Sequence, residues 1–345
     1  MKQILTVVLI FCGLYAMAQQ EPYYTHFRFN TESYNPASAG EHTGFICLTG
    51  VTHYQWRNFD DVTLSRGTDG DPGIPTIDNV APETHNVNVS TLFKIDKAER
   101  NFIGAGLSIV DDNVGVTKAT TIRLNLNYKR RLDRGFREIA VGAGIGMQQF
   151  GVVNPNFKFK DPNDPLIPSQ SVNQGLKNIN AGVFYKQQRL GPFKNFYAGA
   201  SITQLTQENY NQLGTFYRQY VHHYFTVFGA DYELNPTLKL EPAVLFKYGL
   251  TGQYSYVPQV DVSMTALYGE KFRGGVAVRN WANFDAASVL IGFVSGQLEL
   301  GYSYDITLSS VQSVSAGTHE IMIKYCLPYS VAPPERIIRL TPRFL

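Results

Sequence analysis

Two short stretches carry residue types that often do chemistry. His222 and His223 are adjacent, and neighbouring side chains of a strand point to opposite faces, so they are not expected to share a metal ion. The stretch Asp69–Gly73 has carboxylates suited to calcium, but it lacks the extended ligand series of a calcium loop and reads better as an exposed turn. The motifs GxSxG, HExxH and GxxxxGKS/T do not occur. We therefore expect no catalytic centre, no metal and no cofactor.

The element that positions the rest is predicted at Glu138–Gln148. Every second residue from Ile139 to Met147 is apolar, which is the period of a strand. The opposite face carries small or polar residues, namely Ala140, Gly142, Gly144, Gly146 and Gln148. Glycine weakens a strand interior unless something needs the room. This pattern indicates an apolar face toward lipid and a glycine face toward an occupied lumen.

The composition agrees with a transmembrane β-barrel. Charged residues make up 17% of the 345 residues, against roughly 25% in soluble domains. The chain has 21 Tyr, 22 Phe and 30 Gly, as expected for a barrel with aromatic girdles. The net charge is only +2, and the sequence has no basic cluster with interleaved aromatic residues of the kind that binds nucleic acid, so nucleic acid is not expected as a partner.

The N-terminus has the features of a secretory signal peptide. Lys2 precedes an apolar run from Ile4 to Tyr15, and Ala16–Ala18 forms an A-x-A cleavage site. We expect a signal peptide at 1–18 and then an N-terminal periplasmic arm or lumen plug at 19–43. A barrel at 44–327 and a periplasmic C-terminal tail at 328–345 would follow.

Fourteen segments have strand character, with lengths near those of strands that cross a membrane at a tilt. In 119–131, for example, Ile122, Leu124, Leu126 and Tyr128 alternate with polar residues. The segment 220–233 is ambiguous, because aromatic residues occupy both of its faces. The predicted strands are 44–56, 84–95, 101–112, 119–131, 138–149, 178–189, 195–204, 220–233, 237–248, 254–267, 271–280, 286–294, 296–305 and 318–327.

The predicted connections alternate in length. Long ones follow strands 1, 5, 7 and 13, and short ones follow even-numbered strands, as in outer-membrane barrels with short periplasmic turns. In a closed barrel of fourteen strands the last strand pairs with the first. Cys47 and Cys326 could then meet at the periplasmic end of this seam; the alternative is two unrelated small apolar residues.

The polar faces of the predicted strands carry charges of both signs, which argues against an ion-selective pore. One interpretation is a self-satisfied network of interior salt bridges. The other is a surface that grips an inserted protein segment, with room provided by the glycines. Residues for such a surface are Arg123, Lys129, Gly142, Gly144, Gly146, Glu299, Glu320 and Lys324.

Motifs at both ends of the chain resemble the PorP/SprF family of the type IX secretion system of Bacteroidetes. Near the start these are Tyr24-Thr25, Asn35-Pro36-Ala37 with Gly40, and Gln55-Trp56. Near the end they are Tyr304-Asp305 and the run from Gly317 to Ile321. The stretch 57–83 is longer and more acidic than the family's usual continuation.

The resemblance implies a non-enzymatic, multi-pass outer-membrane barrel that anchors or helps export a secreted protein, such as a large surface adhesin of gliding motility. The expected partners are the C-terminal sorting domain of that protein, other secretion components and outer-membrane lipid. Tyr34, Asn35, Gln55 and Trp56 then join the predicted partner-binding residues. The alternatives are a transporter or channel for hydrophobic small molecules, with the N-terminal segment as its plug, and a barrel enzyme with its nucleophile at a strand end.

Overall fold

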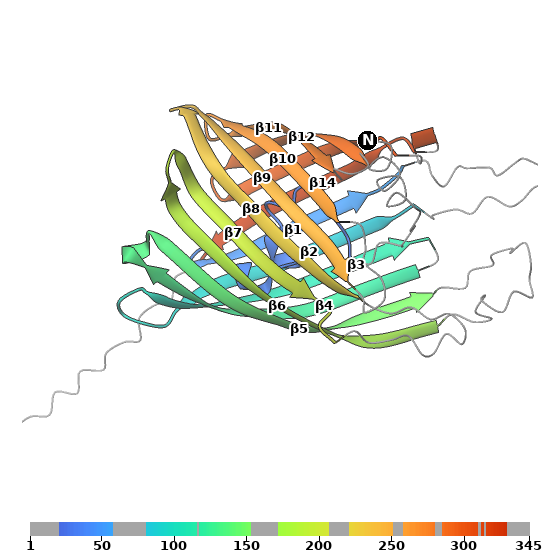
Figure 1. Cartoon of the computed structure of the whole chain (residues 1–345), viewed down its shortest axis with the longest axis horizontal. Helices are drawn as coiled ribbons and strands as arrows, with labels where there is room; N and C mark the ends of the chain where they lie inside the picture. Colours follow the sequence, from blue (N-terminus) through green and yellow to red (C-terminus); the bar gives the residue numbers. More distant parts are fainter. Residues whose placement is uncertain are drawn as a thin grey trace, which may run out of the picture.

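The computed structural model describes residues 21–57, 81–115, 117–152, 172–206, 221–250, 258–279, 285–309, 312–313 and 315–329. The strands form one closed antiparallel barrel in which each strand pairs with its neighbours in sequence and β14 returns to β1. Figure 1 shows the inclined strands enclosing the blue N-terminal residues. The fold class predicted from the period-two pattern is confirmed.

All fourteen predicted strands are present. The largest differences are at β6, which begins earlier, and at β10, whose predicted residues 254–257 lie outside the described residues. The strands are β1 Phe45–Tyr54, β2 Glu83–Lys94, β3 Asn101–Val114, β4 Thr117–Leu132, β5 Arg137–Val152, β6 Val172–Leu190, β7 Phe193–Thr203, β8 His222–Asn235, β9 Leu238–Leu250, β10 Gln259–Tyr268, β11 Phe272–Arg279, β12 Ala286–Ser295, β13 Leu298–Thr307 and β14 Thr318–Pro328.

The two faces of the wall are the reverse of those in a soluble protein. In β4, the apolar residues Ile122 and Leu124 are each 51% exposed, whereas Arg123 is 3% and Asn125 is 0% exposed. The same alternation puts the large apolar side chains of β5 on the outside. Because exposed apolar area of this extent is unfavourable in water, the outer face is the one that meets lipid.

The two ends of the barrel differ in the length of the connections between strands. β4–β5 and β6–β7 are joined by residues 133–136 and 191–192, whereas 55–82 and 153–171 join β1–β2 and β5–β6. We call these the short-turn end and the long-loop end. No helix in the described part of the chain is long and apolar enough to span a membrane.

Residues 21–43, called here the N-terminal segment, lie inside the barrel. Its only regular elements are two short 3₁₀ turns, η1 Thr31–Ser33 and η2 Pro36–Ser38. At one terminus Glu21 contacts Thr203 at the end of β7, and at the other Glu41 contacts Lys324 near the end of β14. The segment therefore runs through the lumen from the long-loop end to the short-turn end, and residues 19–20 lie outside the described residues.

Candidate functional site

Glu320 of β14 makes three hydrogen bonds to the N-terminal segment. This carboxylate is fully buried and accepts hydrogen bonds from the backbone N–H groups of Thr25 (2.9 Å) and His26 (2.6 Å). It also accepts from the Nδ1 atoms of His26 and His53, both at 2.7 Å. Four donors satisfy a charge that would be very unfavourable if left unpaired in the barrel interior. Glu320 is thus an anchor for the segment.

A second anchor lies beside the first. The hydroxyl of Thr25 donates to Asp305 of β13, and the Arg279 guanidinium of β11 donates to that hydroxyl at 3.0 Å. Arg279 also pairs with Asp305 at 3.2 Å and lies over the Tyr23 ring, 3.9 Å from its centroid. Three strands from the C-terminal half of the chain therefore hold residues 23–26.

The Asn35-Pro36-Ala37 motif caps and begins η2, and it faces glycines of the wall. The Asn35 side chain accepts from the backbone N–H of Ala37 at 3.0 Å, and Pro36 fits the first position of the turn. Ala37 is completely buried, and a Cβ at Gly142 would lie 2.7 Å from its Cα atom. A Cβ at Gly182 would lie 2.2 Å from the Asn35 Oδ1 atom. The backbone turn and the bare wall are therefore complementary in shape.

Cations of β4 bind carbonyl oxygens of the segment. Arg123 donates to Ser33 O, and Lys129 donates to Gly40 O at 2.5 Å. Gly40 has a φ of 74°, and a Cβ there would lie 2.4 Å from Thr91 O. Only glycine suits this close approach, because its φ is left-handed and the space beside it is filled.

An apolar cluster fills the middle of the lumen. Tyr34 stacks on Phe225 of β8 at 5.3 Å between ring centroids, and its hydroxyl donates to Phe27 O at 3.2 Å. This contact resolves the ambiguity of β8: Phe225 and Val227 face the lumen, whereas Phe228 faces outward. An aromatic residue can face this lumen because the segment covers it.

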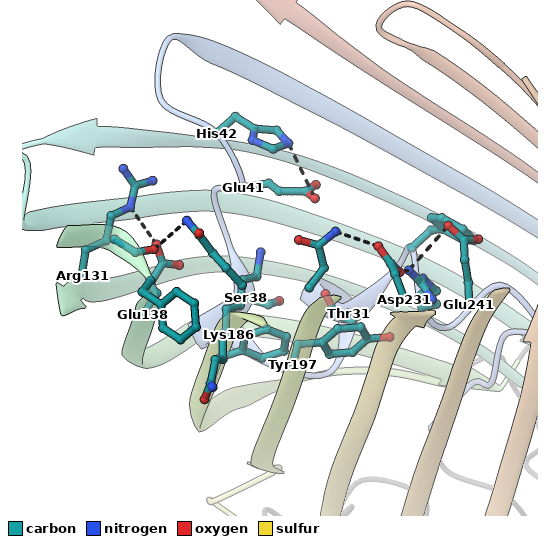
Figure 2. Close-up of a pocket in the computed structure, with 18 of the residues that line it drawn as sticks. Thr31, Ser38, Glu41, His42, Arg131, Glu138, Lys186, Tyr197, Asp231 and Glu241 are labelled. Carbon is teal, nitrogen blue, oxygen red and sulfur yellow. Dashed lines mark hydrogen bonds and ion pairs between the residues drawn. The ribbon is translucent and has the colours of Figure 1, made fainter. Parts of the chain in front are cut away.

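At the short-turn end the lumen opens into a cavity of about 950 Å³, called here the vestibule. The N-terminal segment forms its floor at Thr31 and Ser38, and Glu41 and His42 near the end of the same segment lie over the cavity in Figure 2. Lys324 donates to Glu41, and this ammonium group holds the pKa of the Glu41 carboxyl well below its usual range. Glu299 accepts from Arg273 at 3.4 Å. Polar and charged side chains from β4–β9, β11, β13 and β14 form the rest of the wall.

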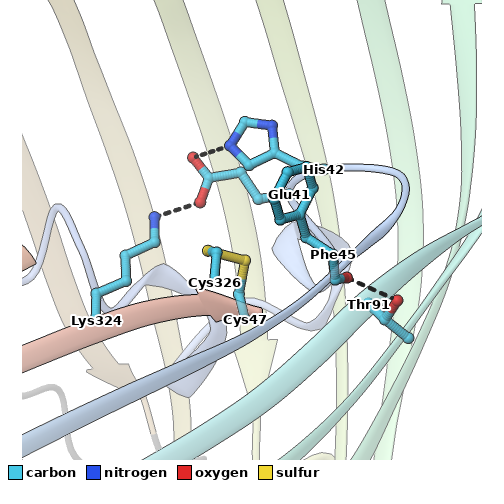
Figure 3. Close-up of a disulfide and its surroundings, with 7 residues drawn as sticks. All are labelled: Glu41, His42, Phe45, Cys47, Thr91, Lys324 and Cys326. Carbon is cyan, nitrogen blue, oxygen red and sulfur yellow. Dashed lines mark hydrogen bonds and ion pairs between the residues drawn. A yellow bond between two sulfur atoms is a disulfide. The ribbon is translucent and has the colours of Figure 1, made fainter. Parts of the chain in front are cut away.

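Cys47 and Cys326 are opposite each other in the β1–β14 register, with Cα atoms 4.0 Å apart, and their sulfur atoms form a disulfide. The bond crosses the seam where the last strand meets the first, near the short-turn end (Figure 3). It closes a loop of sequence separation 279. From the sequence, the even strand count predicted only that the two cysteines could meet at the seam. In the structure they are joined by a disulfide bond.

The sequence-predicted lumen residues fall into three groups, and the first is Glu299 alone, which pairs with Arg273 of the wall in the vestibule. A second group contacts the N-terminal segment from the wall, namely Arg123, Lys129, Gly142, Glu320 and Lys324. Two further predicted residues, Tyr34 and Asn35, belong to the segment itself. Gly144 gives room to the Arg123 side chain, and Gly146 lies against the Ile122 carbonyl, so these two serve the wall itself. Binding of a separate partner by any of these residues stays a prediction.

Gln55 and Trp56 lie at the long-loop end, not in the lumen. The Trp56 N–H donates to the Thr318 hydroxyl at 3.1 Å. Arg57 donates its N–H to Gly317 O at 2.8 Å, and Ala316 donates to Arg57 O at 2.7 Å. The pairing of β1 with β14 therefore continues beyond the last strand residues into a rim, defined here as residues 55–57 and 315–318.

The residues considered for metal chemistry are placed separately. His223 faces the lumen, whereas the Nδ1 atom of His222 donates to the Gln204 carbonyl oxygen at 3.1 Å, so the two rings have different surroundings. No group of three or more potential ligand side chains is placed to hold a metal ion in the described ranges. Asp69–Gly73 lies outside the described residues.

Several segment-binding residues were not singled out from the sequence. Asp231 of β8 is the clearest: it accepts from Arg28 of the segment at 2.5 Å. Asp305 was noted only as part of a motif near the end of the chain, not as a residue of the lumen. Glycines that approach the segment were missed too, since a Cβ at Gly106 would lie 1.8 Å from Glu32 Oε1 and one at Gly301 would lie 2.7 Å from the His26 ring. The available signal was their position on polar faces of predicted strands, which marks the lumen without naming its occupant.

Comparison with known proteins gives one family match. The family model of the type IX secretion system membrane protein PorP/SprF matches residues 16–325. None of the curated proteins matches the chain. Among solved structures, the chain is similar to a Pseudomonas aeruginosa FadL homologue (TM-score 0.48, 11% identity, covering 86% of this chain and 93% of that one). It is also similar to the CymD monoaromatic hydrocarbon channel (0.49, 11%, 84% and 90%) and to the translocator domain of the autotransporter NalP from Neisseria meningitidis (0.42, 12%, 88% and 94%).

A methyl group at Gly142 is predicted to loosen the segment. In Gly142→Ala the Cβ meets the Ala37 backbone, so we expect a loss of about 1–3 kcal/mol in the free energy of unfolding. Amide hydrogen exchange in residues 21–43 should rise as well. Gly274→Ala is the matched control, because the nearest atom to its Cβ is 4.0 Å away. Equal exchange in both variants would contradict the close fit.

Removal of the disulfide is predicted to destabilise the barrel. The Cys47→Ser/Cys326→Ser variant should lose about 2–4 kcal/mol in the free energy of unfolding, because a long closed loop no longer restricts the unfolded chain. In urea titrations, reduced wild-type protein should unfold at about the same urea concentration as this variant. Reductant should not change the unfolding midpoint of the variant itself. Two titratable thiols at these positions in the oxidised native protein would refute the bond.

Proposed function

This chain belongs to the PorP/SprF family of type IX secretion system membrane proteins, as the motifs at its two ends predicted, and we propose that it anchors or helps export a secreted protein without acting as an enzyme. The family and the lipid-facing belt place the barrel in the outer membrane. The proposed partner is the C-terminal sorting domain of a type IX substrate, such as a large surface adhesin. Other type IX components would complete the assembly.

The observation that carries this proposal is the filled lumen. Between its two ends, the N-terminal segment contacts lumen-facing residues of strands from β2 around to β14. A partner therefore meets the barrel at its mouths before it meets the wall. We infer that the segment is a plug that also stiffens the barrel, which gives the partner a rigid surface on which to dock.

The long-loop end is the proposed surface for the sorting domain. In outer-membrane barrels this end faces the outside, where a surface protein is held. Gln55 and Trp56 lie on the rim there, and the backbone pairing of Arg57 with Gly317 and Ala316 fixes their position. A tryptophan on a fixed backbone is the kind of residue that supplies a large share of the affinity at an interface.

The alternative is a channel for hydrophobic small molecules. Such a channel needs an apolar path, but much of the segment–wall interface consists of charged and amide groups, such as Glu320, Asp305 and Arg123. This distribution favours the anchoring function. The experiment below distinguishes the two.

Purification from the native membrane in mild detergent should yield a large exported protein in near-equal amount. Its recovery should depend on its own C-terminal domain, as measured by mass spectrometry of wild-type and truncated strains. Trp56→Ala should lower recovery at least tenfold, since an interface anchor of this kind contributes roughly 2 kcal/mol. Tyr268→Ala, an exposed aromatic residue at the short-turn end, is the control and should leave recovery unchanged. A barrel that purifies alone, or with lipid in its lumen, would shift the assignment to transport.

A further inference from the structure

The short-turn end carries a strong excess of positive charge along one arc. Three stretches form it, 94–100, 130–138 and 186–194, at the β2–β3, β4–β5 and β6–β7 turns. Together they hold ten Lys or Arg residues and only four Asp or Glu residues. We call this the basic arc.

All four acidic side chains of the basic arc are already engaged. Asp96 accepts from the backbone N–H groups of Arg100 and Asn101, both at 2.9 Å, and the Asn101 bond in particular lowers its pKa. The other three carboxylates pair with cations of the same turns, Glu99 with Lys94, Asp133 with Arg137 and Glu138 with Arg131. The excess charge is therefore not neutralised within the arc.

Six cations of the arc have no carboxylate within ion-pair distance among residues that the structure describes. They are Lys97, Arg100, Arg130, Arg134, Lys186 and Arg189. Arg100, Arg134 and Lys186 line the vestibule. The side chain of Lys186 is labelled in Figure 2 beside the Arg131–Glu138 pair.

The floor and the opposite wall of the vestibule are different. Arg28 of the floor pairs with Asp231, and Arg273 and Lys324 of the wall pair with Glu241 and Glu41 respectively. The charges on one side of the cavity are thus paired, while the other side presents Arg100, Arg134 and Lys186, which have no carboxylate partner among the described residues. A ligand that completes this site must carry several negative charges along one side.

We propose that the vestibule binds an acidic, extended peptide segment of another protein on the periplasmic side of the membrane. Short turns of outer-membrane barrels face the periplasm, and a cavity of about 950 Å³ is at the upper end of ligand sites, which run from about 300 to 1,000 Å³. Arg guanidinium groups and a Lys ammonium group bind carboxylates by charge-assisted hydrogen bonds. This site is at the opposite end of the barrel from the proposed sorting-domain surface and does not depend on it.

Two other occupants fit less well. Lipid headgroups surround a barrel from outside, whereas Arg100, Arg134 and Lys186 line a cavity whose floor is the N-terminal segment. The chain's own residues 330–345 follow β14 at this end, but they contain three Arg and one Glu. They would add positive charge to the arc instead of neutralising it.

The test uses the purified full barrel in detergent and a fluorescein-labelled decapeptide of Asp, Glu, Ser and Gly. Fluorescence anisotropy should show saturable binding, and Arg134→Gln/Lys186→Gln should weaken it about tenfold or more. The matched control is Lys239→Gln/Lys271→Gln, which removes the same charge from the short-turn end outside the vestibule and should change affinity less than twofold. Heat-modified gel mobility checks that each variant is folded.

Charge reversal gives the sharper form of the test. Arg134→Glu/Lys186→Glu should lose the acidic peptide and gain a Lys-containing peptide of the same length. Absence of acidic-peptide binding by the wild type, or equal weakening by the control pair, would overturn the proposal. A second measurement compares how much phosphatidylglycerol the wild type and Arg134→Gln/Lys186→Gln retain from nanodiscs, by native mass spectrometry. If the variant still binds the peptide but retains less phosphatidylglycerol than the wild type, the basic arc is a lipid headgroup site and the proposal is overturned.

Discussion

The lumen depends on the satisfaction of one buried carboxylate. Glu320 has no exposed surface, and three of its four hydrogen-bond donors belong to Thr25 and His26. The fourth belongs to His53 of β1, the strand that closes the barrel against β14. An enclosed charge without these donors would cost several kcal/mol. The inserted segment and the closed seam are therefore parts of one arrangement, since β14 tolerates its charge only when both are in place.

This arrangement explains why distinctive motifs occur at the two ends of the chain. Tyr24-Thr25 near the start and Tyr304-Asp305 near the end form one interface through the Thr25–Asp305 hydrogen bond. Asn35-Pro36-Ala37 forms a turn small enough to fit the bare wall at Gly142. Each motif is a weak sequence signal by itself, because the residues that it contacts lie far away in the sequence, as Thr25 and Asp305 do.

The wall could be predicted from the sequence, but for residues 19–43 the sequence left two alternatives, a plug in the lumen or a periplasmic arm. The period of two in β4 and β5 revealed which face meets lipid, and the bare face at Gly142 revealed that something needs room. The N-terminal segment has no periodicity, and its partners lie on many strands, so no local pattern assigns it to the lumen. The face of Phe225 was undecided for the same reason, because it is set by Tyr34 and not by β8.

The segment makes the two mouths of the barrel parts of one structure. Glu21 contacts Thr203 and Gln204 at the long-loop end, and Glu41 contacts Lys324 in the vestibule. The chain between them is continuous and is held along its length by hydrogen bonds to the wall. Any molecule that displaces Glu41 from Lys324 therefore acts on a segment whose other terminus is part of the opposite mouth. A lumen filled in this way suits a protein that holds partners at its ends better than one that passes solutes through its centre.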